Sequence, residues 1–349
     1  MKLFVTAEDL ERNTKKAQKI SSILDHLNEV IPWESFRFTL VSALKKLKKV
    51  HATPPKSNGG RPPFDVILMF KICVLQRIYN ISDAQMEFQI LDRLSFQRFL
   101  GLNIGDAVPD EKTIWHFKNQ LATARAGKDV FEIFNDYLIK HQMILEGGVI
   151  VDASFVEKPH QHFTKDEKAS LDQEEKPEEW KKPEAKAKVS QKDTDAKWTK
   201  KHGKSYFGYK NHVKVNSDSK LIMDYLVTNA AVHDSQALDD LITKKDAGNT
   251  LYADSAYAGM PSLIQALFNN VGYQVHEKAY RNNPLNEEQK ARNKEKSRIR
   301  SRVEHVFAFM ENSMNGMYLR TIGQKRTEFS VGLMNLVYNF FRFEYLKRA

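Results

Sequence analysis

The chain has 349 residues, 54 Lys and Arg against 44 Asp and Glu, and a formal net charge of +10. This length corresponds to about two domains, and a hydrophobic content of 41% excludes disorder of the whole chain. The single cysteine, Cys73, excludes a disulfide framework and a multi-cysteine zinc site, and it favours a reducing, intracellular setting. The sequence predicts neither a signal peptide nor a membrane span, and its basic balance suggests a polyanionic partner.

The first part of the chain has the pattern of several short helices. Apolar residues recur at helical spacing, and Ser or Asp side chains suited to capping precede the apolar runs. Helices are predicted within residues 1–50, over 65–81, from Ser82 or Asp83, over 94–100 and after Asp110, with a Pro- and Gly-rich loop over 51–63. We therefore predict an all-α N-terminal domain over residues 1–145. A DNA-binding helix-turn-helix and a plain packing domain both fit this pattern.

The middle of the chain is highly charged but has almost no net charge. Residues 151–200 hold 11 basic and 12 acidic side chains, and few large apolar residues interrupt them. Such a composition buries little apolar surface, so a flexible, solvated insertion is predicted at about residues 157–204. The flanking parts carry the net positive charge, +4 on residues 1–150 and +7 on residues 201–349.

The last part of the chain alternates between strand and helix patterns. Strands are predicted over 149–155, 206–215, 221–228, 250–254 and 273–277, and helices over 235–245 (with Asp234 as its N-cap), 261–269 and 286–313. Three strands in succession, followed by strands that alternate with helices, predict an α/β sheet covered by helices.

Three acidic residues interrupt apolar stretches of this part. Asp152 lies in the first predicted strand, Asp254 ends the fourth, and Glu304 lies in the last helix. For one such acid, a helix cap or a salt bridge is the simpler explanation. Three acids on two neighbouring strands, which lie ~4.8 Å apart, and a packed helix can converge. A cluster of carboxylates suits Mg²⁺ or Mn²⁺, and two such ions can catalyse phosphoryl transfer.

The local sequences around these acids resemble those of bacterial insertion-sequence transposases of the IS-five group, which have an RNase H-like catalytic core. The motifs that carry the resemblance are Val151-Asp-Ala-Ser154, Gly203-Lys-Ser-Tyr-Phe-Gly-Tyr-Lys210, Val232-His-Asp234, Tyr252-Ala-Asp-Ser-Ala-Tyr257, Ile299-Arg-Ser-Arg-Val-Glu-His-Val-Phe307 and, in the first part, Gly60-Arg-Pro-Pro63, residues 91–102 and 108–114. The resemblance implies an RNase H-like mixed sheet with flanking helices over residues 146–349.

The resemblance also implies a site. Asp152, Asp254 and Glu304 would be the catalytic metal ligands for Mg²⁺ or Mn²⁺, with two ions. The family's third-acid motif reads Tyr-x2-Arg-x3-Glu-x6-Lys, and Arg300 and Glu304 fit it. The Tyr position holds Ser297 and the Lys position holds Glu311. In the family, that Lys contacts the terminal phosphate, and Glu311 does not carry the charge for this contact. Arg298 or Arg302 would then replace that lysine.

Other residues have both a DNA-binding and a structural interpretation. Arg61, Lys210, Arg298, Arg300 and Arg302 are predicted to bind DNA, and His233 and Asp234 to support the site; the residues around 281–302 are rich in basic side chains. An exposed strand lysine, a helix cap and an i,i+4 surface pair are the corresponding structural interpretations. Trp115 is expected in the core, whereas Trp180 and Trp198 remain open between packing and base stacking.

The sequence therefore predicts a DNA transposase that binds terminal inverted repeats and target DNA and that cleaves and joins DNA in a metal-dependent reaction. The resemblance further implies a homodimer, because two element ends are paired, and a cytoplasmic, nucleoid-associated location in bacteria. A catalytically weakened, sequence-specific DNA-binding protein derived from a transposase is the main alternative, because Glu311 departs from the motif. A structure-specific nuclease on the same core is a third hypothesis.

Overall fold

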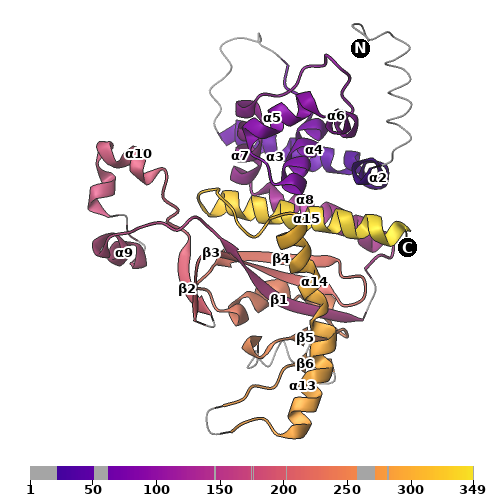
Figure 1. Ribbon diagram of the computed structural model, residues 1–349, viewed down its shortest axis with the longest axis vertical. Coiled ribbons are helices and arrows are strands. Elements are labelled where there is room, and N and C mark those ends of the chain that lie inside the picture. The colour runs from indigo at the N-terminus through magenta and orange to yellow at the C-terminus, as the bar shows by residue number, and fades with distance from the viewer. Residues whose placement is uncertain are drawn as a thin grey trace, which may run out of the picture.

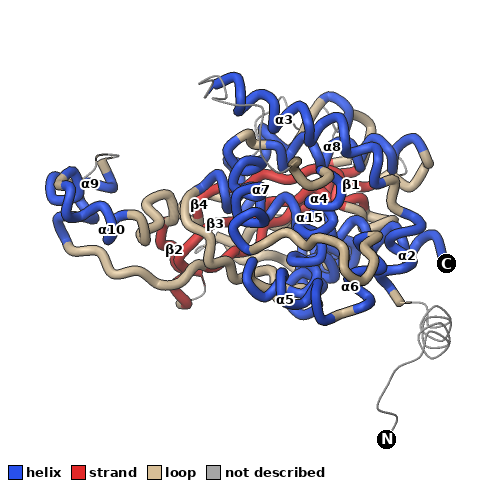
Figure 2. The backbone as a smooth tube through the Cα atoms, turned by 90° about the horizontal axis from the view of Figure 1, so that it is seen from above, coloured by secondary structure: helices blue, strands red, loops and turns tan. Residues whose placement is uncertain are grey.

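The computed structural model describes residues 22–50, 62–144, 147–173, 175, 177–201, 203–257, 272–280 and 283–348. The predicted helix over 261–269, Arg61 and most of the predicted 51–63 loop lie outside these residues. A helical layer lies on one side of a mixed sheet, and the long helix α15 runs between the two (Figure 1). The charged insertion forms a lobe beside the sheet (Figures 1 and 2).

Short capped helices build the N-terminal layer, as the sequence predicts. They are α2 (Ile23–Val30), α3 (Arg37–Val50), α4 (Val66–Tyr79), α5 (Asp83–Asp92), α6 (Leu94–Leu100), α7 (Glu111–Thr123) and α8 (Ala126–Lys140). The side chains of Asp65, Ser82 and Asp110 accept hydrogen bonds from the first turns of α4, α5 and α7. These bonds satisfy backbone N–H groups that have no partner within the helix, which explains why the helices begin there.

A six-stranded mixed sheet forms the second layer. Its strands are β1 (Gly148–Glu157), β2 (Lys197–Lys201), β3 (Lys204–Asn216), β4 (Ile222–Asn229), β5 (Thr250–Ala253) and β6 (Tyr273–Val275). The order is β2-β3-β1-β5-β6, and β4 also pairs with β3. The β1–β3, β2–β3 and β3–β4 pairs are antiparallel, whereas β5 runs parallel to β1 and to β6. Antiparallel strands followed by parallel ones form an RNase H-like sheet.

Two predicted helices of the last part are broken in the structure. The predicted 235–245 helix reduces to a 3₁₀ turn, α11 (Leu238–Leu241) and a second 3₁₀ turn, because Thr243 and Asp246 form a capping box of their own. His233 rather than Asp234 occupies the N-cap position. The predicted 286–313 helix divides at Ser301 into α13 (Glu287–Arg300) and α14 (Arg302–Ala308), followed by a π-helical turn over Phe309–Ser313.

The charged insertion contains short regular elements where the sequence suggests a flexible loop. Helices α9 (Lys165–Asp172) and α10 (Lys186–Val189) and strand β2 lie within it. The carboxylate of Glu167, 3% exposed, accepts hydrogen bonds from the indole of Trp180 at 2.8 Å and from Lys192 at 3.1 Å. This buried carboxylate organises a small core around Trp180, whereas the ring of Trp198 is 42% exposed and packs on Phe207.

A buried lysine fastens the insertion to the rest of the molecule. The ammonium of Lys158 donates to the carbonyl of Thr321 at 2.6 Å and to the hydroxyl of Thr327 at 2.7 Å. It also lies 4.0 Å from one carboxylate oxygen of Asp193, and the other oxygen accepts a hydrogen bond from the hydroxyl of Tyr209. Burial lowers the pKa of Lys158 to about 8. These contacts join the end of β1, the insertion and the start of α15.

Helix α15 (Gln324–Arg348) is the inner layer of the molecule (Figure 2). One continuous apolar core joins it to the N-terminal helices and to one face of the sheet. Two asparagines on α15 bond to the sheet: Asn335 exchanges side-chain hydrogen bonds with Asn211, and Asn339 binds both the N–H and the carbonyl of Ile222. Within the described residues, no helix combines the length and apolar content that crossing a membrane requires.

Replacing Asn339 by Leu should lower the free energy of unfolding by about 1–3 kcal/mol. The substitution leaves the backbone N–H and carbonyl of Ile222 buried without their side-chain partner, and an unmade buried hydrogen bond costs that much. Urea denaturation measures the change. Lys347→Ala, at the exposed end of the same helix, should change stability by less than about 0.5 kcal/mol; equal losses in the two variants would contradict a specific role for Asn339.

Candidate active site

The register of the sheet brings two of the predicted acids next to each other. β1 and β5 pair in parallel, with Ile150 opposite Tyr252. Continuing this pairing by two residues places Asp152 opposite Asp254, which follows the last residue of β5. Neighbouring strands lie ~4.8 Å apart, so the two carboxyl groups stand side by side. They lie at the carboxyl end of β5, where sheets of this kind bind ligands.

Both acids lie on the face that α14 covers. Ile150 packs in the same core as Val303 of α14, whereas Val151 belongs to the separate core on the opposite face. Alternate residues of a strand share a face, so Asp152 lies on the side of Ile150 and of α14. The same alternation on β5 gives Asp254 that side. The sequence prediction that strand acids and a helix meet is therefore consistent with the arrangement of the elements.

Arg300 links the first acid to the third. Its guanidinium lies 2.7 Å from a carboxylate oxygen of Asp152 and 3.6 Å from one of Glu304. The side chains of Arg300 and Asp152 are only 20% and 15% exposed, whereas that of Glu304 is 65% exposed. Arg300 ends α13 and Glu304 lies in the first turn of α14, so the break at Ser301 sets their relative position. The bond to Asp152 distinguishes Arg300 from an ordinary i,i+4 surface pair.

The site concentrates negative charge in a partly buried space. Burial raises the pKa of Asp152 to about 6; the positive charge of Arg300 opposes this shift, and the negative charge of Asp254 adds to it. Burial also raises the pKa of Tyr257 well above its usual range, and the charges of Asp152, Asp234 and Asp254 contribute. The cost of a buried carboxylate falls when a cation lies beside it. In the structure, Arg300 supplies that cation.

Two of the three predicted acids offer ligands of the kind that a divalent cation prefers, in neighbouring positions. Carboxylate oxygens are the ligands that Mg²⁺ and Mn²⁺ prefer, and Asp152 and Asp254 share one row and one face. Glu304 contacts Arg300 and is turned largely to solvent. Across the described residues, no three acidic, histidine or cysteine side chains converge closely enough to hold a metal together. Asp152 and Asp254 are thus neighbours on the sheet, and Glu304 lies 3.6 Å from the guanidinium of Arg300.

Lys210 lies on the face of the sheet opposite Asp152, and the turn that begins at Asp234 packs against the turn that follows Asp254. Lys210 is 8% exposed, and its ammonium donates to Asp234 and to the carbonyl of Val232, both at 2.7 Å. The ring of His233 is exposed and caps the turn that follows. The positive charge of Lys210 is therefore satisfied inside the protein, where the sequence suggested a contact to DNA.

The predicted basic residues of the last helices differ in their surroundings. Arg302 donates to the carbonyl of Ser217 at 2.8 Å and pairs with Asp218 at 3.0 Å, so it is engaged within the protein. Arg298 is exposed on α13. Arg61, the remaining predicted contact, lies outside the described residues. Of the two arginines suggested in place of the motif's lysine, Arg298 is the more exposed, and the side chain of Arg302 is 41% exposed.

His276 is a residue of this row that the sequence analysis missed. β5 and β6 pair in parallel up to Ala253, and the backbone N–H of His276 bonds to the carbonyl of Ala253. His276 thus follows β6 as Asp254 follows β5. Its ring nitrogen lies 3.2 Å from the hydroxyl of Ser297 on α13, the position where the motif has Tyr. The predicted strand over 273–277 includes His276, whereas the observed strand ends at Val275, so the sequence pattern did not single this residue out.

The comparisons with known proteins agree with this fold. A family model described as "Transposase DDE domain" matches residues 145–340, and one described as "Transposase domain (DUF772)" matches residues 11–120. The first match spans more than half of the chain, so the chain belongs to the transposase DDE domain family. No solved structure was found that matches the chain. The expectation of a DDE transposase, a DNA-acting protein with an RNase H-like sheet, is confirmed at this level.

Asp152→Asn should stabilise the metal-free protein at neutral pH. Burial raises the pKa of Asp152 from 3.8 to about 6, so folding favours its protonated form. The stability that this group contributes is present below about pH 4 and is lost as the pH rises through about 6. In EDTA, the variant should gain about 2–3 kcal/mol on the wild type between about pH 4 and pH 7.5, measured by urea denaturation.

The exposed Asp92→Asn variant controls for the removal of an acid as such. A stability difference between Asp152→Asn and the wild type that stays constant with pH would contradict the raised pKa. A difference of opposite sign would mean that Arg300, left without Asp152, costs more than the buried carboxylate.

Proposed function

We propose that this DNA transposase belongs to the IS-five group and binds the terminal inverted repeats of an insertion sequence. It would cleave DNA at the element end and join the freed 3′-hydroxyl to target DNA. The observation that carries this proposal is the placement of Asp152 and Asp254 in one row and on one face, beside the helix of Glu304. Because two element ends are joined to one target, we further propose that a homodimer acts.

Asp152, Asp254 and Glu304 are the proposed holders of two divalent ions, Mg²⁺ or Mn²⁺. When bound, such ions stabilise the attacking and leaving oxygens of an in-line phosphoryl transfer. The chain's own groups supply the position: Asp152 from β1, Asp254 from the end of β5 and Glu304 from α14. The exposure of Glu304 leaves its carboxylate free to turn from Arg300 toward the other two acids.

Arg300 is the proposed positioning residue of the site. Its guanidinium bonds to Asp152 and lies near Glu304, so it orients one acid and holds the other nearby. A guanidinium also binds phosphate oxygens through two parallel hydrogen bonds. When the acids bind a cation, Arg300 becomes available for the phosphate of the substrate. This role needs both the charge and the planar donor group of an arginine.

A catalytically weakened DNA-binding protein is the second candidate, and one observation favours it. Glu311, in the place of the motif's lysine, is exposed in the π-helical turn after α14 and carries the opposite charge. The engagement of Arg302 with Asp218 removes one of the two suggested substitutes. If Arg298 does not contact the terminal phosphate, the protein would bind the element ends without processing them.

Alanine at any of the three acids should abolish cleavage. The substrate is a duplex that carries the terminal inverted repeat found beside the gene, incubated with Mg²⁺ and resolved on a denaturing gel. Loss of a metal ligand removes several kcal/mol of transition-state stabilisation, so Asp152→Ala, Asp254→Ala and Glu304→Ala should each cleave at least ~10³-fold more slowly. DNA binding by these variants, measured by fluorescence anisotropy, should be nearly unchanged.

The control for this series is Asp92→Ala, which removes an exposed acid elsewhere. Wild-type protein that binds the repeat but does not nick it would favour the weakened DNA-binding protein. Nicking by all three acid variants at the rate of the wild type would reject the proposed ligands. Cleavage of branched DNA regardless of its end sequence would favour a structure-specific nuclease.

Arg300→Gln should strengthen metal binding and weaken cleavage at the same time. Removing the guanidinium frees the carboxylates of Asp152 and Glu304 from a competing cation. Calorimetric titration of the DNA-free protein with Mn²⁺ should show about tenfold tighter binding, or ~1.4 kcal/mol. Arg298→Gln removes an exposed arginine of the same helix and should leave Mn²⁺ affinity unchanged. Unchanged affinity in Arg300→Gln would argue against competition between Arg300 and the metal.

A further inference from the structure

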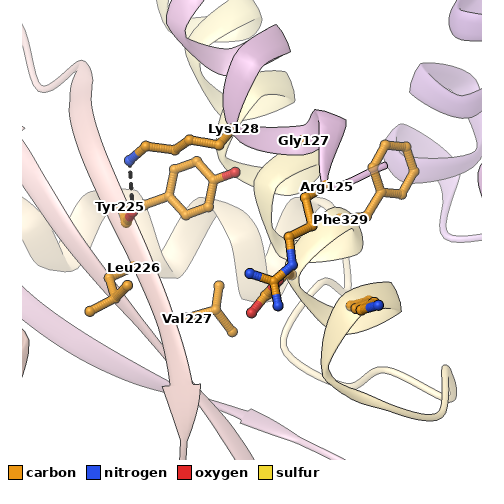
Figure 3. A pocket seen from close by; sticks show the side chains of 9 residues that line it. Arg125, Gly127, Lys128, Tyr225, Leu226, Val227 and Phe329 are labelled. Atoms are coloured by element: carbon orange, nitrogen blue, oxygen red, sulfur yellow. Dashed lines mark hydrogen bonds between the residues drawn. The ribbon is translucent and has the colours of Figure 1, made fainter. Parts of the chain in front are cut away.

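Two adjoining cavities open where the α7–α8 connection meets the start of α15. They share Arg125 and Lys325, and we call them together the Arg125–Lys325 crevice. The first, of about 280 Å³, is also lined by Gly127, Lys128, residues 225–227 of β4, Glu328 and Phe329 (Figure 3). The second, of about 350 Å³, is lined on its other side by Asn119, Ala122, Thr123, Asp195, residues 322–324 and Arg326.

The cations of the crevice differ in how far the protein neutralises them. Lys128 is engaged with Asp224 and with the carbonyl of Tyr225. Arg125 and Lys325 are exposed, and Figure 3 shows Arg125 directed into the space between α8, β4 and α15. The backbone of Arg125 is left-handed, with φ of 54°, which turns the side chain out at the start of α8.

The two acids of the crevice are bound to the start of α15. A carboxylate oxygen of Asp195 accepts the backbone N–H of Gln324 at 2.9 Å, and Glu328 accepts its side-chain amide at 2.8 Å. Both carboxylates thus accept hydrogen bonds from Gln324. The start of α8, in contrast, has no side-chain cap hydrogen bond at Arg125, and Gly127 of its first turn lines the first cavity. Two exposed cations beside the start of a helix suit an anion.

An exposed tryptophan extends this surface along α7. Trp115 is 48% exposed, although the sequence analysis expected it in the core. Arg326 explains the difference: its guanidinium lies 5.8 Å from the ring centre of Trp115 and donates to Asn119 at 2.9 Å. A guanidinium fixed over an exposed indole is a pairing that proteins use against nucleic acid. It borders the second cavity, which Asn119 and Arg326 line.

The crevice lies on the same cross-strand row as the acids. Asp152 pairs with Val213 on β3, and Val213 pairs with Tyr225 on β4, which lines the first cavity. Two strand spacings, or ~10 Å in the plane of the sheet, therefore separate Asp152 from this cavity wall. The acid row and this cavity wall are thus close enough for one DNA duplex to reach both.

We propose that the Arg125–Lys325 crevice binds the phosphate backbone of duplex DNA, with Arg125 and Lys325 as the phosphate-contacting cations. The proposal rests on the proposed function in that DNA is the partner. It adds a second contact, apart from the acid row, that would hold the duplex while one of its bonds is cleaved. Contacts of this kind set affinity and orientation and do not read sequence.

The test is the DNA affinity of the double variant Arg125→Ala/Lys325→Ala. Fluorescence anisotropy with a labelled duplex of mixed sequence, without Mg²⁺, gives the dissociation constant at several salt concentrations. Affinity at low salt should fall by at least about tenfold, and the slope of log affinity against log salt should shrink by about two, one for each lost phosphate contact. The matched control is Lys244→Ala/Lys245→Ala, which removes two exposed lysines from another surface.

Unchanged affinity and slope in Arg125→Ala/Lys325→Ala, with a thermal unfolding profile like that of the wild type, would overturn the proposal. An equal loss in the Lys244→Ala/Lys245→Ala control would also overturn it, because total charge would then be the cause. If the double variant unfolds, Arg125→Gln and Lys325→Gln are tested singly, and each should reduce the slope by about one. If the crevice variants lose DNA binding and the wild type does not cleave DNA, the crevice proposal is supported and the proposed catalysis is rejected. Failure of the crevice proposal and failure of the proposed function therefore give different results.

Discussion

The pairing of β1 with β5 is the constraint on which the site depends. Gly148 begins this pairing, and a Cβ atom at that position would lie 2.6 Å from the hydroxyl of Ser217 and 2.9 Å from the ring of Tyr252. The absence of a side chain therefore lets the two strands meet in this register. A slip of one residue would turn Asp152 to the opposite face and away from α14. The alignment of two acids from distant parts of the chain follows from a short stretch of backbone pairing.

Local rules predicted much of the fold, including the position of Asp152 within a strand and of Asp254 at the end of another. Capping residues such as Asp65 and Asp110 act within one helical turn, so their sequence signal is complete. The insertion has a capping box at Thr164 and Glu167, but its small core depends on the contact from Glu167 to Trp180, 13 residues further along the chain. His276 escaped notice for a related reason: its place beside Asp254 follows from strand pairing and from no motif.

The positive charge of the chain divides into buried and exposed parts that composition does not separate. Lys158, Lys210 and Lys214 lie next to Asp193, Asp234 and Asp246, and each of these lysines is at most 8% exposed. These lysines hold loops and the insertion to the sheet. Their charges are compensated, so they contribute little to the field outside the protein. The cations that a polyanion meets are those left exposed, such as Arg125, Lys325 and Arg298.

The position of helix α15 late in the sequence affects how the protein folds during synthesis. Among the described helices it comes last in sequence, yet it is the layer that both the N-terminal helices and the sheet pack against. While a ribosome is still producing residues 324–348, the two earlier parts are complete in sequence but lack their common core. They must keep large apolar faces from aggregating until residues 324–348 have been made. A chain cut before Gln324 would thus lose both of its parts, and would not leave a stable DNA-binding fragment that competes with the full protein.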